Sequence, residues 1–162
     1  MNKSNISAAI VLLVLFFALA ACGGAEERNS EELDMLALAE ALVDGIAFDD
    51  QMEVASDEAF RALYAVDSAD DSVADFVLFT STGATAEEVS VIEARDGQSA
   101  SGVLEFALGR VASQKSEFEN YAPEEMAKLN DPVLVRSGKY IILCLSNDNA
   151  TAKDIIEDFM GS

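Results

Sequence analysis

Histidine is absent from the chain, and its absence excludes several classes of catalytic site. A Ser-His-Asp triad needs an imidazole as its general base, and a zinc site of the HExxH type needs two imidazole ligands. The chain has only two cysteines, Cys22 and Cys144, which are too few for a zinc site of thiolates or a framework of disulfides. We therefore expect no catalytic residues, no metal site and no cofactor.

Basic residues are scarce as well. The 162 residues include 10 Lys and Arg against 30 Asp and Glu, for a net charge of −20. Binding to nucleic acid and adsorption to anionic lipid headgroups both depend on Lys and Arg. Nucleic acid is thereby excluded as a partner, and surface charge does not attach the chain to a membrane. With 51% hydrophobic residues the chain can bury a core, and its length predicts one domain.

One apolar segment near the N-terminus, from Ala8 to Ala21, contains no charged residue. With the single Lys3 before it, this segment has the layout of a secretory signal. A helix of about 14 residues rises only about 21 Å, which is less than the roughly 30 Å of a bilayer core. The segment ends in Leu19-Ala20-Ala21-Cys22, which looks like the lipobox of bacterial lipoproteins.

Cys22 is the expected point of membrane attachment. We predict a signal peptide over 1–21 that is removed, a lipid anchor on Cys22, and a flexible tether over 22–29. Two acyl chains, such as those of a diacylglycerol, are the usual requirement for stable anchoring. The predicted location is the extracytoplasmic side of the cell membrane. An ordinary cleaved signal and an uncleaved signal anchor are the alternatives.

Residues 30–162 are predicted to form a single α+β domain. Asn29 with Glu32 has capping-box spacing and predicts a first helix over 30–44, and Ser56 predicts the start of a second. The pattern then predicts, in order, a strand at 75–81, a strand at 88–95, a helix at 98–120, a short helix at 123–129, a hairpin of two strands within 132–146 that turns at Ser137-Gly138, and a helix at 151–160. We expect two N-terminal helices followed by a mostly antiparallel four-stranded sheet packed with helices.

The predicted strands differ in how apolar their two faces are. Residues 140–146 and 75–80 are apolar on both faces and are predicted to be central, whereas 88–95 and 133–136 carry charges and are predicted to be edges. A sheet with two apolar faces needs a cover on each. We expect either that the two N-terminal helices cover the second face, or that part of it is an open apolar platform for a partner or ligand.

The long predicted helix carries the candidate binding residues. Its apolar stripe consists of Leu104, Leu108, Val111 and Phe118. Arg110 and Gln114 lie one turn apart beside the stripe, and Tyr121 follows on nearly the same side. Together these three side chains could hold a carboxylate or a peptide, because a guanidinium suits bidentate contacts. The alternative is that Arg110 pairs with a nearby acid and Tyr121 caps the core.

Three further features have both a functional and a structural interpretation. The acidic loop 67–75 lacks the pattern of an EF-hand, so a solvated loop is favoured over a calcium site. Residues 81–88 could cradle an anion with their backbone amides, but they lack a lysine and do not open onto a helix, which favours a plain hairpin loop. Cys144 lies in an apolar strand and is expected to be a small buried hydrophobe rather than a reactive thiol.

Residues 82–146 resemble a known family. The segments TGATAEEVSVIEA, RVASQKSEFENYAPEEMAKL and SGKYIILCLSND are similar to the family catalogued as domain of unknown function number 4358, and the matching residues include Gly83, Glu88, Arg110, Gln114, Phe118, Tyr121, Pro123, Gly138 and Tyr140. That family is found on lipoproteins of Gram-positive bacteria. The resemblance implies an exported, lipid-anchored domain, in agreement with the lipobox, and it implies no particular activity.

Three functions are compatible with these features. We favour a non-enzymatic binding or adaptor module on an exported, membrane-anchored lipoprotein, with an envelope protein or a small ligand as its partner. The second is an envelope structural component that supplies charge and bulk. The third is a carboxylate-dependent hydrolase acting on cell-wall material, which needs an acid with a raised pKa in a cleft. The sequence leaves the oligomeric state open.

Overall fold

The structure of the protein is a computed structural model that describes residues 32–161. The predicted signal peptide, the lipid anchor on Cys22 and the tether over 22–29 lie outside the described residues and stay predictions. Residues from Leu33 onward form one compact unit. No helix in the described part of the chain has both the length and the hydrophobicity needed to cross a bilayer.

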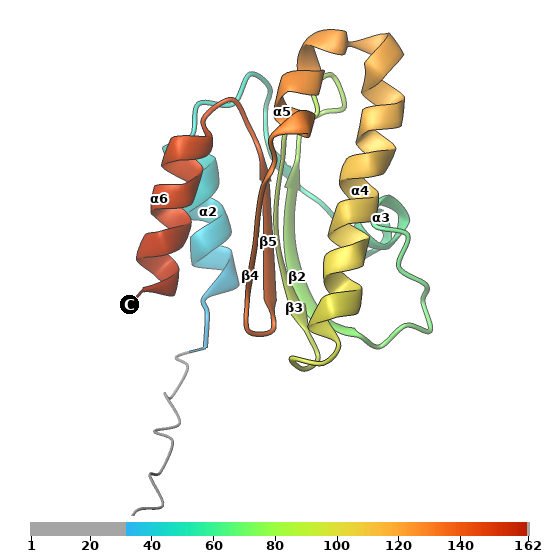
Figure 1. Ribbon diagram of the computed structural model, residues 1–162, viewed down its shortest axis with the longest axis vertical. Helices are drawn as coiled ribbons and strands as arrows, with labels where there is room; N and C mark the ends of the chain where they lie inside the picture. The colour runs from blue at the N-terminus through green and yellow to red at the C-terminus, as the bar shows by residue number, and fades with distance from the viewer. Residues whose placement is uncertain (1–31, 162) are drawn as a thin grey trace, which may run out of the picture. The chain divides into compact units, whose positions relative to one another are not determined.

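The described chain interleaves helices with short strands (Figure 1). The elements are, in order, α2 (Met35–Gly45), β1 (Glu53–Val54), α3 (Asp57–Leu63), β2 (Val73–Thr80), β3 (Glu88–Ala94), α4 (Ala100–Tyr121), a 3-10 turn (Pro123–Glu125), α5 (Met126–Asn130), β4 (Val133–Ser137), β5 (Tyr140–Leu145) and α6 (Asn149–Met160). The helix predicted from residue 30 begins at Met35, because the Asp34 carboxylate accepts a hydrogen bond from the Ala37 N–H at 2.9 Å. Gly138, with a φ of 57°, makes the turn between β4 and β5.

Five strands form one antiparallel sheet within residues 32–161, in the order β1-β2-β3-β5-β4. Two hairpins, β2–β3 and β4–β5, meet where β3 pairs with β5. In this register Val91 of β3 lies opposite Val77 of β2 on one side and Ile142 of β5 on the other. The pairing of the two hairpins therefore places β3 and β5 at the centre of the sheet.

The predicted arrangement of two N-terminal helices followed by a four-stranded sheet is wrong. A fifth strand, β1, lies between α2 and α3 in the chain and pairs Glu53 and Val54 with Thr80 and Phe79 of β2. This strand has only 2 residues and both are exposed, so it offers no alternation of polar and apolar residues for a sequence pattern to detect. The prediction agrees with the structure only in the broad α+β class.

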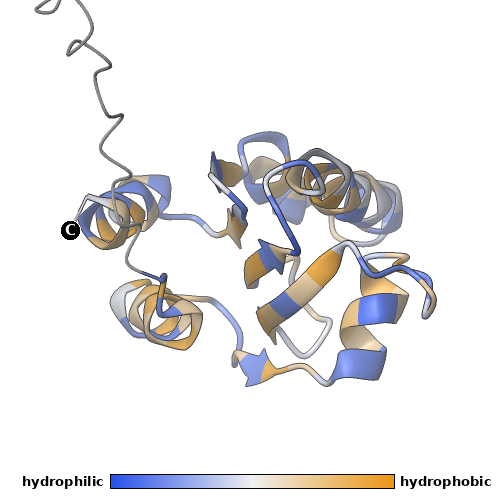
Figure 2. Ribbon diagram, turned by 90° about the horizontal axis from the view of Figure 1, so that it is seen from below, coloured by the Kyte–Doolittle hydropathy of each residue, from blue (hydrophilic) through white to orange (hydrophobic). Residues whose placement is uncertain are grey.

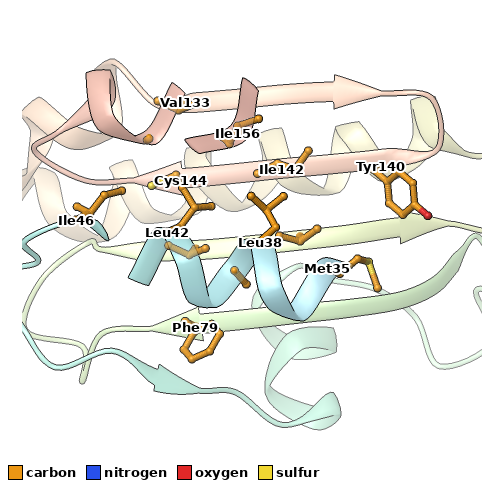
Figure 3. Close-up of a cluster of buried hydrophobic side chains, with 14 residues drawn as sticks. Met35, Leu38, Leu42, Ile46, Phe79, Val133, Tyr140, Ile142, Cys144 and Ile156 are labelled. Carbon is orange, nitrogen blue, oxygen red and sulfur yellow. The ribbon is translucent and has the colours of Figure 1, made fainter. Parts of the chain in front are cut away.

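Helices cover the sheet on both faces, with α2 and α6 on one side and α3, α4 and α5 on the other (Figures 1 and 2). On the α2 side, Leu38 and Leu42 of α2 and Ile156 of α6 pack together with Ile142 and Cys144 of β5 (Figure 3). These side chains are 0–2% exposed, and burial of each large apolar side chain contributes about 1.5–3 kcal/mol.

The opposite face carries a second apolar cluster, in which Phe60 of α3 and Val103 of α4 pack on Leu78, Ile92 and Ile141 of the sheet. The two N-terminal helices therefore do not share a face, contrary to the prediction. Between α2 and α3 the chain passes around the β1 edge of the sheet. The C-terminal α6, and not α3, packs beside α2. Because β5 is buried from Tyr140 to Leu145, the described residues leave no open apolar platform on this strand.

One of the four predicted strand positions is wrong, whereas 75–80 and 140–146 have a neighbour on both sides and 133–136 is an edge, as predicted. The charges of the strand predicted at 88–95 favour an edge position, but β3 lies between β2 and β5. Its charges are accommodated by partners from other elements: Glu88 pairs with Arg110 of α4, and Glu93 pairs with Lys139 of the β4–β5 turn. A paired carboxylate thus occupies a central strand that the sequence pattern alone assigns to an edge.

Candidate functional site

The side chain of Glu88, at the start of β3, is completely buried beneath α4. Its Oε2 accepts hydrogen bonds from Arg110 Nε at 2.9 Å and from Gln114 Nε2 at 3.0 Å, and Arg110 Nη2 lies 2.8 Å from the same oxygen. Arg110 and Gln114 reach it together because residues four apart lie on the same face of a helix. The pairing of Arg110 with a nearby acid, which was the alternative interpretation of the sequence, is what the structure contains.

Tyr64 and Ser90 complete this buried polar cluster. Tyr64 Oη lies 2.7 Å from Glu88 Oε1 and 2.7 Å from Ser90 Oγ. The single phenolic proton is donated to the carboxylate, and the Ser90 hydroxyl donates to the phenolic oxygen. Burial, together with the charge of Glu88, raises the pKa of Tyr64 well above its usual range. Tyr64 therefore stays neutral and serves as a donor to Glu88 rather than as a base.

The buried stripe of α4 differs from the apolar stripe expected from the sequence. Leu108 is 44% exposed, whereas the side chains facing the sheet include Val103, Ala107, Arg110 and Gln114. Arg110 and Gln114 belong to the buried face because both donate hydrogen bonds to the carboxylate of Glu88 on β3. An arginine on an otherwise apolar helix face was the signal that could have identified a buried acid, and Glu88 is the residue that sequence reasoning left out of the site.

A hollow of about 240 Å³ lies beside this cluster, between α4 and the loop that joins β2 to β3. Arg110 and Gln114 contribute to its lining, together with the hydroxyl residues Thr80, Ser81, Thr82 and Thr85. Leu63 and Phe118 add apolar surface, and Glu87 and Glu117 add carboxylates. The hollow thus combines a guanidinium, an amide and several hydroxyls with a smaller apolar area.

Two polar groups of the cluster have unused hydrogen-bonding capacity. Gln114 is 2% exposed, and its Oε1 accepts no hydrogen bond within the described residues. Exchanging the amide nitrogen and oxygen would set an oxygen against Glu88 Oε2, so the orientation with Nε2 on Glu88 is the favourable one. Arg110 uses Nε and Nη2 on Glu88, and its Nη1 makes no hydrogen bond or ion pair with a described residue. One acceptor and one donor group therefore have no hydrogen-bond partner within the described residues.

Tyr121, the third predicted binding residue, is not part of this site. It is 74% exposed at the end of α4, where its ring packs edge-on against Phe118 with 6.2 Å between ring centroids. Eleven residues of helix separate it from Arg110 by about 16 Å along the axis. The structure brings Arg110 and Gln114 together and places Tyr121 outside the hollow, on the surface rather than over the core.

A second buried network holds the loop that borders the hollow. Lys128 of α5 is 3% exposed, and its Nζ lies 3.0 Å from Asp49, 3.2 Å from Glu87 and 2.9 Å from Glu125. Burial opposes the charge of this lysine, but the hydrogen bonds to Glu125, Asp49 and Glu87 outweigh burial and raise its pKa. Glu87 in turn accepts from the backbone N–H groups of Asp49 and Asp50. The loop is therefore tied to both α5 and the segment before β1.

The other candidate features have structural roles in the described chain. In the loop 81–88, the N–H groups of Thr82 and Ala86 donate to Asp50 and Glu125, so carboxylates of the protein already occupy these amides. Residues 32–161 contain no group of three or more Asp, Glu, Cys or His side chains arranged to hold a metal ion. Cys144 is fully buried, and burial raises its pKa to about 11, which leaves the thiol protonated.

Comparison with known proteins adds one finding. No curated protein and no solved structure matches the chain. Residues 46–146 match the family described as Domain of unknown function (DUF4358), a range that begins well before residue 82 and includes β1, α3 and β2. Both the Glu88 cluster and the hollow lie inside this range, whereas α2 and α6 lie outside it. Because the match covers more than half of the 162 residues, the chain belongs to the DUF4358 family.

Proposed function

We propose that this chain is an exported lipoprotein that acts as a non-enzymatic binding module at the cell envelope. Its anchor is an acylated Cys22, on the extracytoplasmic side of the cell membrane. The apolar segment from Ala8 to Ala21 and the Leu19-Ala20-Ala21-Cys22 sequence support this part of the proposal. The net charge of −20 supports attachment through lipid rather than through the protein surface.

The binding part of the proposal depends on one observation, the polar hollow beside a buried amide whose oxygen accepts no hydrogen bond within the described residues. A buried acceptor without a hydrogen bond costs about 1–3 kcal/mol. Gln114 Oε1 is such an acceptor, and Gln114 lines the hollow next to Arg110. A ligand seated there would lie against both side chains, and the cluster around Glu88 holds them in place before it arrives.

The arrangement favours binding over hydrolysis. An acid–base catalyst needs a carboxyl group that can exchange its proton with a substrate. Glu88 is engaged by Tyr64, Arg110 and Gln114. Glu87, at the hollow, is engaged by backbone N–H groups, a threonine hydroxyl and Lys128. Glu117 is exposed on α4, and Glu87 is the only other acid among the described residues that line the hollow.

A blocked variant and a matched control test this function. Glu117→Trp places a large ring at the rim of the hollow, whereas Glu119→Trp places the same ring on an exposed part of α4 outside the lining. The full chain in detergent would be screened by thermal shift against divalent ions, amino acids, peptides, sugars and wall fragments. A ligand at one hundred times its Kd adds about 2.7 kcal/mol, which raises the midpoint by several degrees.

We expect at least one compound to stabilise the parent chain and the Glu119→Trp variant but not Glu117→Trp. If no compound shifts the midpoint, or if both variants respond equally, the hollow is not a binding site. The role as an envelope structural component would then be preferred, because that role tolerates a blocked hollow.

A further inference from the structure

The charges around the hollow are largely neutralised by partners inside the protein. Arg110 lies 2.8 Å from Glu88, and Glu87 lies 3.2 Å from Lys128. Neither the guanidinium nor this carboxylate presents an uncompensated charge to a bound molecule. What the lining offers is therefore chiefly hydrogen-bonding atoms rather than net charge.

The remaining exposed charge works against anions. Glu117 is exposed at the rim, and the whole chain carries a net charge of −20. An anionic ligand would be repelled on approach and would meet this carboxylate on arrival. A cationic ligand would be drawn toward the surface, but the carboxylate of Glu87 in the lining is already paired with Lys128 and would not pair with it. A neutral ligand meets neither difficulty.

The polar atoms call for a ligand that both donates and accepts hydrogen bonds. Gln114 Oε1 needs a donor, and Arg110 Nη1 can donate to an acceptor. The Ser81 and Thr82 hydroxyls already donate, to Thr85 O and Asp50 Oδ2, and Ser81 Oγ also accepts from the Gly83 N–H. One lone pair of Ser81 and those of Thr82 can therefore accept from a ligand. A hydroxyl group fills all of these roles, because it donates one hydrogen bond and accepts two.

The size of the hollow limits the ligand further. Its volume of about 240 Å³ falls below the roughly 300–1,000 Å³ of sites for drug-sized molecules. Leu63 and Phe118 provide a small apolar area suited to the C–H face of a sugar ring. We infer that the hollow binds a neutral, hydroxyl-rich ligand the size of one sugar ring. This inference depends on the proposed binding function and specifies what is bound.

The test compares neutral and charged forms of the same ring. The full chain, held in a detergent without a sugar headgroup, would be titrated with glucose, galactose and N-acetylglucosamine, and with glucosamine and glucuronate as charged analogues. Saturation-transfer NMR detects contact with the protein, and calorimetry gives Kd. We expect at least one neutral sugar to bind at least about tenfold more tightly than either charged analogue.

Gln114→Met and Gln98→Met form the matched pair of variants. The first removes the amide at the hollow while keeping a similar shape, and the second removes an exposed amide outside it. We expect Gln114→Met to weaken sugar binding at least about tenfold, and Gln98→Met to leave it unchanged. Should Gln114→Met fail to fold, Glu117→Trp leaves the Glu88 cluster intact and should abolish the same binding.

Each result separates the two proposals. Binding of a charged analogue, an amino acid or an anion that is lost in Gln114→Met or Glu117→Trp would overturn the inference about neutral sugars while leaving the binding module in place. Sugar binding that is equal in the parent chain, Gln114→Met and Glu117→Trp would place the sugar elsewhere and overturn the inference. Absence of binding by every sugar and by every compound of the wider screen would overturn both.

Discussion

At the scale of single residues, Glu88 is where burial and charge conflict most strongly. A buried ion pair adds little net stability by itself, but removing one partner leaves the other as an uncompensated buried charge. Glu88 avoids this cost because Arg110, Gln114 and Tyr64 all donate to it. The arginine that the sequence indicated as a ligand-binding residue is therefore a structural partner of Glu88 first.

Arg110→Ala should destabilise the protein strongly. The variant leaves the carboxylate of Glu88 buried with 0% exposure and without its cation, so we expect the free energy of unfolding to fall by about 3–5 kcal/mol. Urea unfolding followed by circular dichroism measures the change. Arg61→Ala is the control, because its salt bridge with Asp57 is exposed at the surface and should contribute less than about 1 kcal/mol. Equal effects of the two substitutions would contradict this account of Glu88.

Ala65 has a left-handed backbone conformation, with a φ of 53°, just after α3. Its position lets the Val66 N–H donate to the Arg61 carbonyl at 2.9 Å and so close the helix. Because glycine adopts this conformation without strain, Ala65→Gly should stabilise the protein by up to about 1 kcal/mol. Ala62→Gly, within α3, should destabilise it by about 1 kcal/mol. Thermal unfolding of the two variants would disprove the account if both moved the midpoint in the same direction.

At the scale of elements, α6 begins with a charged cap. Asp148 accepts hydrogen bonds from the Thr151 hydroxyl at 2.7 Å and the Thr151 N–H at 3.1 Å, and these bonds lower the pKa of its carboxyl. A lowered pKa in the folded state means that the stabilisation is complete above the unfolded value of about 3.9 and is lost as the pH falls through the folded value.

Asp148→Ala should therefore destabilise the protein more at about pH 6 than at about pH 2.5. Urea midpoints of the parent chain and the variant at both pH values give the comparison. The control is Asp154→Ala, which removes an exposed acid of α6 that makes no hydrogen bond with a described residue. The same measurement on this variant shows the effect of removing an acid from α6 outside the cap, and a pH-independent effect of Asp148→Ala would contradict the role of the charged cap.

Elements were easier to predict than their arrangement. The turn at Gly138, the cap at Ser56 and the first helical position at Pro123 depend on residues close in sequence, and each lies at a helix or strand boundary of the structure. The two-residue β1 was missed because it has no pattern of its own. The central position of β3 was missed because the partner that neutralises Glu88 comes from α4, 22 residues away.

At the scale of the whole molecule, attachment to the membrane is the main prediction. Cys22→Ala should abolish incorporation of a labelled fatty acid when the full chain is produced in a bacterium, and should release the protein from the membrane fraction. Cys144→Ala should keep the label, because the Cys144 thiol is buried and its pKa is about 11. Gel fluorescence of the labelled protein measures both, and label that persists in Cys22→Ala would refute the anchor.

The amino-acid sequence was sufficient to predict the local structure, and it supports the exclusions, which stay predictions. The lack of histidine, the excess of acids and the capping and turn residues act through composition or through neighbours in the chain. It also carried the family resemblance and pointed to Arg110 and Gln114. The three-dimensional fold was needed to show that Tyr121 faces solvent, that α2 packs beside α6, and that Glu88 pairs with Arg110 beside a polar hollow. These depend on how the two hairpins pair and which face each helix covers, and such contacts between distant residues leave no periodic pattern in the chain.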